Sequence, residues 1–461
     1  MPVRDDPLDA ILASMAAKTG NVLKSEASEE QPKTSSVKRK HDAVDEDVAA
    51  TDASESTGIW NPKDWERLPQ ALLDDVEQRA SSMTISPAME IARQQVVRQL
   101  CQKIRRASEE MGINKLPNSV YETWQFTSRL TVAEVDPLIP HSSSDYSGLF
   151  EELVKAGATR TGAKKKCKEL TKEAEKMLRR FKAQSYETSQ KRRVKVSEEE
   201  GMRVLTYGHC SVKLSVSHFT KLQRLYERQS QKRITRPQDR HAFEAAVFSL
   251  LLRYDSLDGG GFQAALNEEC FDVLLKHFDC KMECFASPLN SRYSRFCSAF
   301  LDTDAAFGSV GSFFEFAPRS GSFEANPPFI PKLIKRMADH MTSLLDAAEG
   351  ALMFVIIIPA WRETEGWQLL HNSRYNQHHE LIPQKDHGYC EGKQQIRKTR
   401  WRIASFDTSV FFWQNPKALN RWKVTGESIR ELRQAFQSKQ ADERDALGLR
   451  NSGKRVRAMK H

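Results

Sequence analysis

The sequence lacks features that would place it in several common classes of protein. No apolar run approaches the roughly 20 residues of a membrane-spanning helix, and the longest, 352–358, ends at Pro359. The first residues do not follow the pattern of a secretory signal. Among the eight cysteines there is no Cys-x-x-Cys pair, and no His or Cys pair follows Cys280 and Cys284 at zinc-finger spacing. We therefore expect no membrane association, no metal cofactor, and reduced thiols in the nucleus or cytosol.

The positive charge of the chain is unevenly distributed. Over 461 residues, 70 Lys and Arg exceed 61 Asp and Glu, for a net charge of +9. Residues 160–196 alone contain 14 Lys and Arg against 4 Glu, including Lys164, Lys165 and Lys166. Such a stripe is suited to contact a nucleic-acid backbone. The alternative is a solvated helix, because Leu170, Ala174, Met177, Leu178 and Phe181 recur at helical spacing and would pack inward. Nucleic-acid contact is favoured because the charges are nearly all of one sign.

Composition and periodicity divide the chain into four segments. Residues 1–57 and 436–461 are predicted to be disordered tails. Lys38-Arg39-Lys40 resembles a minimal nuclear import signal, with a chance cluster in a basic tail as the alternative, and we expect a nuclear protein. Residues 58–200 are predicted to form an α-helical basic domain that guides RNA, with helices over 69–80 and 87–111. Residues 201–435 are predicted to form an α/β domain that begins with a hairpin over 202–216.

The most informative stretch of the α/β segment is Asn326-Pro327-Pro328-Phe329. Two successive prolines hold the backbone extended and remove two N–H donors. The Asn326 side-chain oxygen and the Pro327 carbonyl are then able to accept both hydrogens of an exocyclic amine, while Phe329 stacks on the base. This arrangement suits methyl transfer to N6 of adenine, which needs the amine lone pair held in line rather than a strong base. A proline-rich turn without chemistry is the alternative.

The flanks of this motif favour an open α/β sheet. A helix is predicted to start at Pro331, with apolar residues at helical spacing after it. The unbroken apolar run 352–358 predicts a parallel strand buried on both faces. Asn326 would then lie at the end of a strand, where ligands bind in such sheets.

A second stretch is compatible with a site for S-adenosylmethionine and equally with an ordinary strand–turn–helix unit. A short strand followed by a small-residue turn is expected beneath the methionine part of this cofactor, although the usual Gly-x-Gly is absent. A helix is expected to start near Asn290, with Phe296 facing inward. The residues predicted to bind the cofactor at this turn are Phe285, Ala286, Ser287, Pro288 and Asn290.

Further cofactor contacts are expected downstream of the turn. Asp302 or Asp304 is placed to meet the ribose hydroxyls, although either could instead cap a helix. Phe307 and Gly308 are expected in a loop over the cofactor adenine. Residues 313–316 are predicted to form a strand.

These segments resemble the catalytic domain of the phosphorylated-CTD-interacting-factor family. The resemblance rests on residues 283–290, 300–309, 321–329 and 358–362, and it extends from about Met202 to about Leu432. It implies a Rossmann-like class I methyltransferase domain preceded by a helical domain. It further implies methylation, from S-adenosylmethionine, of N6 of 2′-O-methyladenosine next to the mRNA cap, with the adenine held by Asn326, Pro327, Pro328 and Phe329.

Two departures from the family pattern affect partners. The WW domain of animal members needs two tryptophans about 20 residues apart; Trp60 and Trp65 are too close and Trp124 is too far. We therefore expect a relative without this module and doubt contact with the RNA polymerase II tail. Ala360 also replaces the acid that usually precedes the tryptophan of the Pro-x-Trp motif.

Candidate contacts to the cap or its phosphates are Arg253, Trp361 and Arg362. Each is also a residue type that commonly serves packing or ion pairing. Two other functions stay open: an adenine N6-methyltransferase acting on DNA or internal RNA positions, because the motif recognises only the base, and a non-catalytic RNA-binding scaffold. A comparison of methyl transfer to capped and uncapped RNA distinguishes the cap-specific enzyme from the broader adenine methyltransferase. RNA binding without cofactor binding would identify the non-catalytic scaffold.

Overall fold

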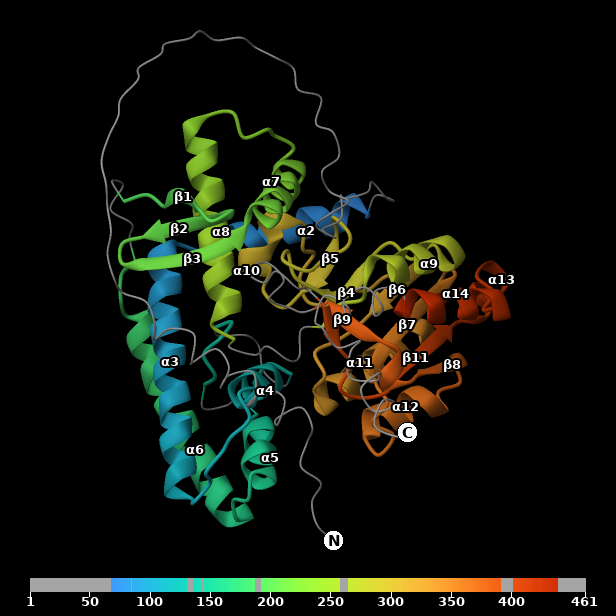
Figure 1. Ribbon diagram of the computed structural model, residues 1–461, viewed down its shortest axis with the longest axis horizontal. Helices are drawn as coiled ribbons and strands as arrows, with labels where there is room; N and C mark the ends of the chain where they lie inside the picture. The colour runs from blue at the N-terminus through green and yellow to red at the C-terminus, as the bar shows by residue number, and fades with distance from the viewer. Residues whose placement is uncertain are drawn as a thin grey trace, which may run out of the picture. The chain divides into compact units, whose positions relative to one another are not determined.

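The computed structural model describes residues 68–83, 85–130, 136–141, 145–186, 192–257, 264–390 and 401–437 (Figure 1). The predicted N-terminal tail, with its Lys38-Arg39-Lys40 cluster, lies outside the described residues, as does 438–461. The described helices and strands all belong to the unit formed by the chain after Gly58.

Helices dominate the first part of the described chain. Their bounds are α2 (Gln70–Ser81), α3 (Pro87–Glu110), α4 (Val120–Ser128), α5 (Ser147–Lys155) and α6 (Arg160–Lys182). Helix α3 begins where the Ser86 hydroxyl accepts the Met89 N–H at 3.2 Å, and Pro87 occupies its first turn. Helix α6 packs on α3 through the predicted apolar stripe, which is buried from Leu170 to Phe181. The helices predicted over 69–80 and 87–111 are confirmed.

A small antiparallel sheet follows the helices. It consists of β1 (Lys195–Glu199), β2 (Met202–Tyr207) and β3 (Cys210–Ser215) in that order. Gly208 has a φ of 63°, which makes the tight turn of the predicted hairpin possible. Helices α7 (Val216–Ser230) and α8 (Pro237–Asp255) pack against this sheet, and α8 also packs on α3.

The second half of the chain forms a six-stranded sheet in the order β5-β4-β6-β7-β11-β8. Strands β4, β5, β6 and β7 are parallel, whereas β11 runs antiparallel to both neighbours. The strands are β4 (Glu283–Ala286), β5 (Phe296–Ser298), β6 (Gly321–Ala325), β7 (Leu352–Pro359), β8 (Asn376–Ile382) and β11 (Thr408–Gln414). The short strands β9 (Gly388–Cys390) and β10 (Trp401–Ile403) pair separately.

Helices cover both faces of the six-stranded sheet (Figure 1). Because side chains alternate along a strand, Phe354 and Ile356 of β7 pack with α11 and α12, whereas Val355 and Ile357 pack with α9 and α14. The predicted strand over 352–358, buried on both faces, is confirmed. The helices are α9 (Glu268–Phe278), α11 (Pro331–Asp346), α12 (Glu365–Asn372), α13 (Pro416–Arg421) and α14 (Gly426–Gln437).

Two predicted elements are wrong. No helix starts near Asn290; the N–H groups of Arg292 and Tyr293 donate to the Glu283 carboxylate at 2.6 and 3.2 Å instead of to a helical carbonyl. Phe296 consequently lies on strand β5. Residues 313–316 form a turn in which the Phe316 N–H donates to the Ser312 and Phe313 carbonyls, and the strand that comes next is β6.

The structure does not separate the early helices as a domain. One apolar cluster contains Trp124 of α4 and Leu178 of α6 together with Phe248 of α8, and it continues into Phe300 and Leu333 beside the six-stranded sheet. The chain after Gly58 therefore has a mixed α/β fold around continuous cores, and a distinct helical domain is not confirmed.

Candidate active site

The order of the parallel strands creates a crevice at one edge of the sheet. From β4 the chain first adds β5 on one side and then β6 on the other, so the direction of winding reverses between β4 and β6. Ligands in open α/β sheets bind outside the carboxyl ends of strands at such a reversal. The turn after Ala286 and the motif after Ala325 both begin at these carboxyl ends.

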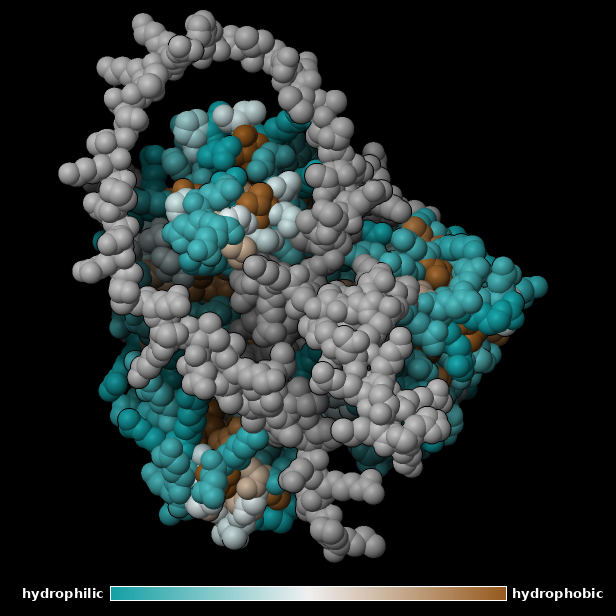
Figure 2. All heavy atoms as spheres, in the orientation of Figure 1, coloured by the Kyte–Doolittle hydropathy of each residue, from teal (hydrophilic) through white to brown (hydrophobic). Residues whose placement is uncertain are grey.

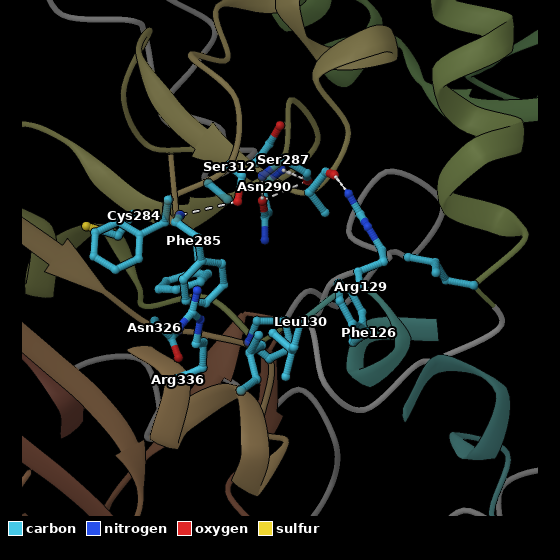
Figure 3. Close-up of a pocket in the computed structure, with 18 of the residues that line it drawn as sticks. Phe126, Arg129, Leu130, Cys284, Phe285, Ser287, Asn290, Ser312, Asn326 and Arg336 are labelled. Atoms are coloured by element: carbon cyan, nitrogen blue, oxygen red, sulfur yellow. Dashed lines mark hydrogen bonds between the residues drawn. The ribbon is translucent and has the colours of Figure 1, made fainter. Parts of the chain in front are cut away.

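A cavity of about 360 Å³ lies at this crevice (Figure 3). Its size falls in the range of small-molecule sites. Residues of the two predicted motifs line the cavity on the side of the sheet. Residues of α4, α8 and α11 form the opposite walls. The lining residues are Phe126, Arg129, Leu130, Tyr254, Leu257, Ala264, Cys284, Phe285, Ala286, Ser287, Asn290, Ser298, Ala299, Ser312, Phe313, Phe314, Glu315, Asn326, Pro328, Leu333 and Arg336.

The turn after β4 is held by its own side chains. The Ser287 N–H and hydroxyl both donate to the Asn290 amide oxygen, at 2.7 and 2.8 Å. These bonds close a tight turn directly after β4, beside the cavity. Four of the five residues predicted here line the cavity, namely Phe285, Ala286, Ser287 and Asn290, whereas Pro288 is buried behind them.

Asn326 projects into the same cavity from the end of β6 (Figure 3). Its amide nitrogen donates to the Ala264 carbonyl at 2.7 Å, which fixes the orientation of the side chain. Its amide oxygen is buried and has no hydrogen-bond partner. A buried acceptor without a donor is costly, so this atom is suited to receive an N–H from a ligand. The observation fits an exocyclic amine held at this position.

The rest of the motif is divided between the cavity and the core. Pro328 lines the cavity, and its carbonyl accepts the Ile330 N–H at 2.7 Å. The Phe329 ring is buried, edge-on to Tyr389 and Phe406 at centroid distances of 5.8 and 5.5 Å. Neither Pro327 nor Phe329 is among the lining residues. In this structure Phe329 anchors the motif rather than facing the cavity.

The downstream residues predicted for the cofactor do not reach the cavity. Asp304 is buried and accepts hydrogen bonds from the Tyr254 and Thr303 hydroxyls at 2.6 and 2.9 Å. Phe307 packs against Tyr226 in the core instead of lying in a cofactor-covering loop. Gly308 has a φ of 106°, and a Cβ there would lie 2.1 Å from the Ser294 carbonyl oxygen, which is a packing requirement.

Arg253 is not available as a cap or phosphate contact. Its guanidinium is fully buried and is paired with Glu90 at 2.8 Å and with Asp302 at 2.7 Å. Burial opposes its charge, but these two carboxylates raise the pKa of Arg253 well above its usual range. The expectation for Arg253 is corrected: it joins α3, α8 and α10 (Leu301–Asp304) in a buried ion network.

The other predicted substrate contacts lie away from the cavity. Trp361 is half-buried against Phe406, and Arg362 beside it is exposed. Lys164 and Lys165 are exposed on α6, whereas Lys166 is bonded to Glu110 and Glu169 at 2.5 and 3.0 Å. Hydrophilic side chains cover much of the surface around α3 and the adjoining part of α6 (Figure 2).

Sequence reasoning missed several cavity residues because they come from distant elements. Phe126 and Arg129 belong to α4 and the residue after it, and Arg129 donates to the Ala299 carbonyl at 2.6 Å (Figure 3). Arg336 lies on α11 with its guanidinium over the Phe314 ring at 5.8 Å. Arg336 is one of several charged residues between the apolar positions of α11, and neither it nor the α4 residues carried a signal in the sequence that pointed to the cavity.

Two buried carboxyl groups lie on neighbouring strands behind the cavity. Glu283 of β4 and Glu324 of β6 are register partners. Burial raises the pKa of Glu283 to about 7, although the N–H groups of Arg292 and Tyr293 oppose this shift. Burial, with the Glu283 carboxyl beside it, raises the pKa of Glu324 well above its usual range. The pair therefore keeps its protons to higher pH than two exposed carboxyl groups would.

The sequence of this chain is similar to those of known proteins. A family model described as the phosphorylated CTD interacting factor 1 WW domain matches residues 221–392. The chain is similar to two mammalian methyltransferases. It is 37% identical over 256 residues, 53% of this chain, to proteins of Homo sapiens and Mus musculus named mRNA (2′-O-methyladenosine-N(6)-)-methyltransferase. The match spans only 35% of each relative's length.

The family match corrects one expectation. From the spacing of the tryptophans we expected a family member without the WW domain. The matching family model is described as that WW domain, so this expectation is contradicted. The matched residues run from α7 through the parallel strands to β9 and include both cavity motifs.

Two further features are absent from the described residues. None of the helices there combines the length and apolar character that crossing a bilayer requires. The same part of the chain holds no group of three or more His, Cys, Asp or Glu side chains that could bind a metal ion.

Proposed function

We propose that this chain is an S-adenosylmethionine-dependent methyltransferase that modifies N6 of 2′-O-methyladenosine next to the mRNA cap. The observation that carries the proposal is the Asn326 side chain, whose amide is oriented by Ala264 and whose buried oxygen lacks a donor within a cavity of suitable size. The names of the two mammalian relatives support the substrate.

The motif residues would orient the target amine. The Asn326 oxygen would accept one amine hydrogen. We assign the second to the Pro327 carbonyl, although of the two prolines only Pro328 lines the cavity, because the Pro328 carbonyl already accepts the Ile330 N–H. With both hydrogens bound, the nitrogen lone pair is directed away from the motif and across the cavity. Phe329 holds the backbone of the motif in place through Tyr389 and Phe406.

The turn after β4 would hold the methyl donor. Phe285, Ala286, Ser287 and Asn290 line the part of the cavity at the first parallel strand, where Rossmann-like folds bind nucleotides. S-adenosylmethionine would supply an electrophilic methyl group. The chain's own contribution is to orient the amine and to exclude water with the apolar walls of α4 and α8.

We further propose that RNA reaches the cavity along basic surfaces. Lys164 and Lys165 on α6 and Arg362 after β7 are exposed cations, and Trp361 offers a half-exposed ring for the cap or a neighbouring base. A helical, RNA-guiding role for the early helices, contact with the RNA polymerase II tail, and nuclear localisation belong to the same proposal. The family description supports the polymerase contact.

One assay tests the function directly. Purified protein is incubated with labelled methyl donor and with capped RNA beginning with 2′-O-methyladenosine, and the nucleosides are analysed by mass. We expect N6-methylated product from capped RNA and much less from uncapped RNA or DNA of the same sequence. Equal transfer to uncapped RNA or DNA would replace the cap substrate with the broader adenine substrate, and no transfer to any of them would reject the enzyme.

A further inference from the structure

The two acidic residues that follow β5, Asp302 and Asp304, already accept hydrogen bonds from other side chains. Asp302 accepts two hydrogen bonds from Arg253, both at 2.7 Å. Asp304 accepts those of Tyr254 and Thr303. Neither lines the cavity. If the cavity binds the ribose of a nucleoside through a carboxylate, the carboxylate has to come from another part of the chain.

The segment after Phe307 runs along the outer side of β5. Phe296 and Ser309 form a parallel bridge, the Val310 N–H donates to the Phe296 carbonyl at 2.9 Å, and the Ser298 N–H donates to Gly311 at 2.9 Å. This segment occupies the position of a further parallel strand. Its carboxyl end therefore meets the same edge of the sheet as the ends of β4 and β5.

The four residues at that end, Ser312 to Glu315, all line the cavity. Glu315 is the single carboxylate among the described lining residues, and 60% of its side chain is exposed. One of its oxygens receives the Arg79 guanidinium of α2 at 2.6 Å. Arg79 also binds Asp75 at 3.0 Å, which holds the guanidinium on its own helix.

We infer that Glu315 is the acid that accepts hydrogen bonds from the ribose hydroxyls of the methyl donor, and that Arg79 is a positioning residue for it. The inference rests on the proposed function. A ribose diol offers two donors to one carboxylate, and a carboxylate already oriented by a guanidinium loses less rotational freedom when the ligand binds. Helix α2, which precedes the rest of the described fold, thus contributes to the donor site.

The test measures binding of S-adenosylhomocysteine and of its 2′-deoxy and 3′-deoxy analogues by calorimetry, with no substrate RNA. For Glu315→Ala we expect about tenfold weaker binding of S-adenosylhomocysteine, since hydrogen bonds to charged groups are worth about that much. Each deoxy analogue keeps only one of the two hydroxyls, so Glu315→Ala should weaken its binding clearly less than that of S-adenosylhomocysteine. Glu315→Asp should recover part of the affinity.

Arg79→Met should weaken S-adenosylhomocysteine binding by about fivefold, as expected for a partly exposed ion pair, and Arg79→Lys should restore most of it. Glu349→Ala is the matched control: it removes an exposed carboxylate 4.0 Å from Arg319, outside the cavity, and should change nothing. Thermal unfolding of each variant confirms that it folds.

The outcomes separate the two proposals. If Glu315→Ala weakens all three ligands equally, or none, the ribose role is wrong while the proposed function stands. If the parent protein binds none of the three ligands, the methyl-donor site itself is rejected, and this inference with it.

Discussion

At the scale of single residues, the cavity depends most on the amide of Asn326. The side chain is used asymmetrically, because its nitrogen is bonded to Ala264 and its oxygen is free of donors. Replacement by Asp would set a carboxylate against the Ala264 carbonyl, with no hydrogen between them. Replacement by Ala would remove the acceptor altogether. Both changes affect the amine, not the turn after β4.

We predict that Asn326→Ala lowers methyl transfer to capped RNA by on the order of 100-fold, since misplacing a reacting group has an effect of that size. Binding of S-adenosylhomocysteine should change by less than about twofold. Single-turnover transfer and calorimetry measure the two quantities. An active Asn326→Ala protein would remove Asn326 from the site, and equal loss of cofactor binding would indicate a disturbed fold.

The paired carboxyls of Glu283 and Glu324 lead to a prediction about pH. Both have pKa values raised by burial, so each favours the protonated form in the folded state. Their contribution to stability is fully present below the unfolded pKa, and it is lost as the pH rises through the folded pKa, which is about 7 for Glu283. The parent protein should therefore lose stability between slightly acidic and slightly alkaline pH.

Glu324→Gln removes one of these groups without changing its size. We predict that the variant is more stable than the parent at about pH 8 and little changed at about pH 5, so that its stability depends less on pH. Urea unfolding at both pH values is the measurement. A variant that lost equal stability at both would show that the Glu324 carboxyl serves packing or hydrogen bonding instead.

At the scale of elements, α6 combines a buried apolar face with an exposed basic one. Its apolar face packs in the core, while Lys164, Lys165 and Lys168 are exposed on the opposite side. Lys166 differs, because Glu110 and Glu169 already neutralise it. The element therefore contains its own control.

Changing Lys164, Lys165 and Lys168 to Glu should weaken RNA binding and lower the slope of affinity against salt by about 0.7 per lost phosphate contact. Lys166→Gln should have a smaller effect. Fluorescence anisotropy over a range of salt concentrations gives the slopes. If the triple variant keeps the parent slope, the basic face of α6 is only solvated and RNA follows another surface.

Arg253 links three elements and is predicted to matter for stability. Arg253→Met would leave the Asp302 carboxylate without its buried cation and would leave Glu90 with Arg93 alone. Removing one member of a buried ion pair destabilises a protein by about 3–5 kcal/mol. Denaturant unfolding checks this against Arg319→Met, which breaks an exposed pair and should cost less than about 1 kcal/mol. Equal costs would contradict the buried network.

At the scale of the whole molecule, the early helices and the sheet share cores. Phe300 and Leu333 belong to the same apolar cluster as Leu178 of α6. We predict that helices and sheet unfold in one transition, because neither buries its apolar surface alone. Far-ultraviolet and near-ultraviolet circular dichroism should give coincident urea midpoints. Two separate midpoints would instead support an independent helical domain.

Local chemistry determined a large part of this protein from the sequence alone. Proline at a first helical turn, an unbroken apolar run and a hairpin glycine each depend on neighbouring residues, so α11, β7 and the β2–β3 turn were predictable. The placement of Asn326 at a strand end came from the same local signals. The strand predicted over residues 313–316 was wrong. Aromatic side chains favour strands, but here tertiary packing selected a turn.

Only the tertiary structure decided which side chains reach the cavity. Spacing along the chain does not reveal that Arg253 meets Glu90 from 163 residues away, or that Arg79 meets Glu315. Burial then determines the role of each charged side chain. A buried charge needs a partner within the protein, and its hydrogen-bonding groups are then no longer available, whereas an exposed charge can still bind a ligand. For that reason the structure assigns internal hydrogen bonds and ion pairs to Asp302, Asp304 and Arg253, whereas Glu315 lines the cavity.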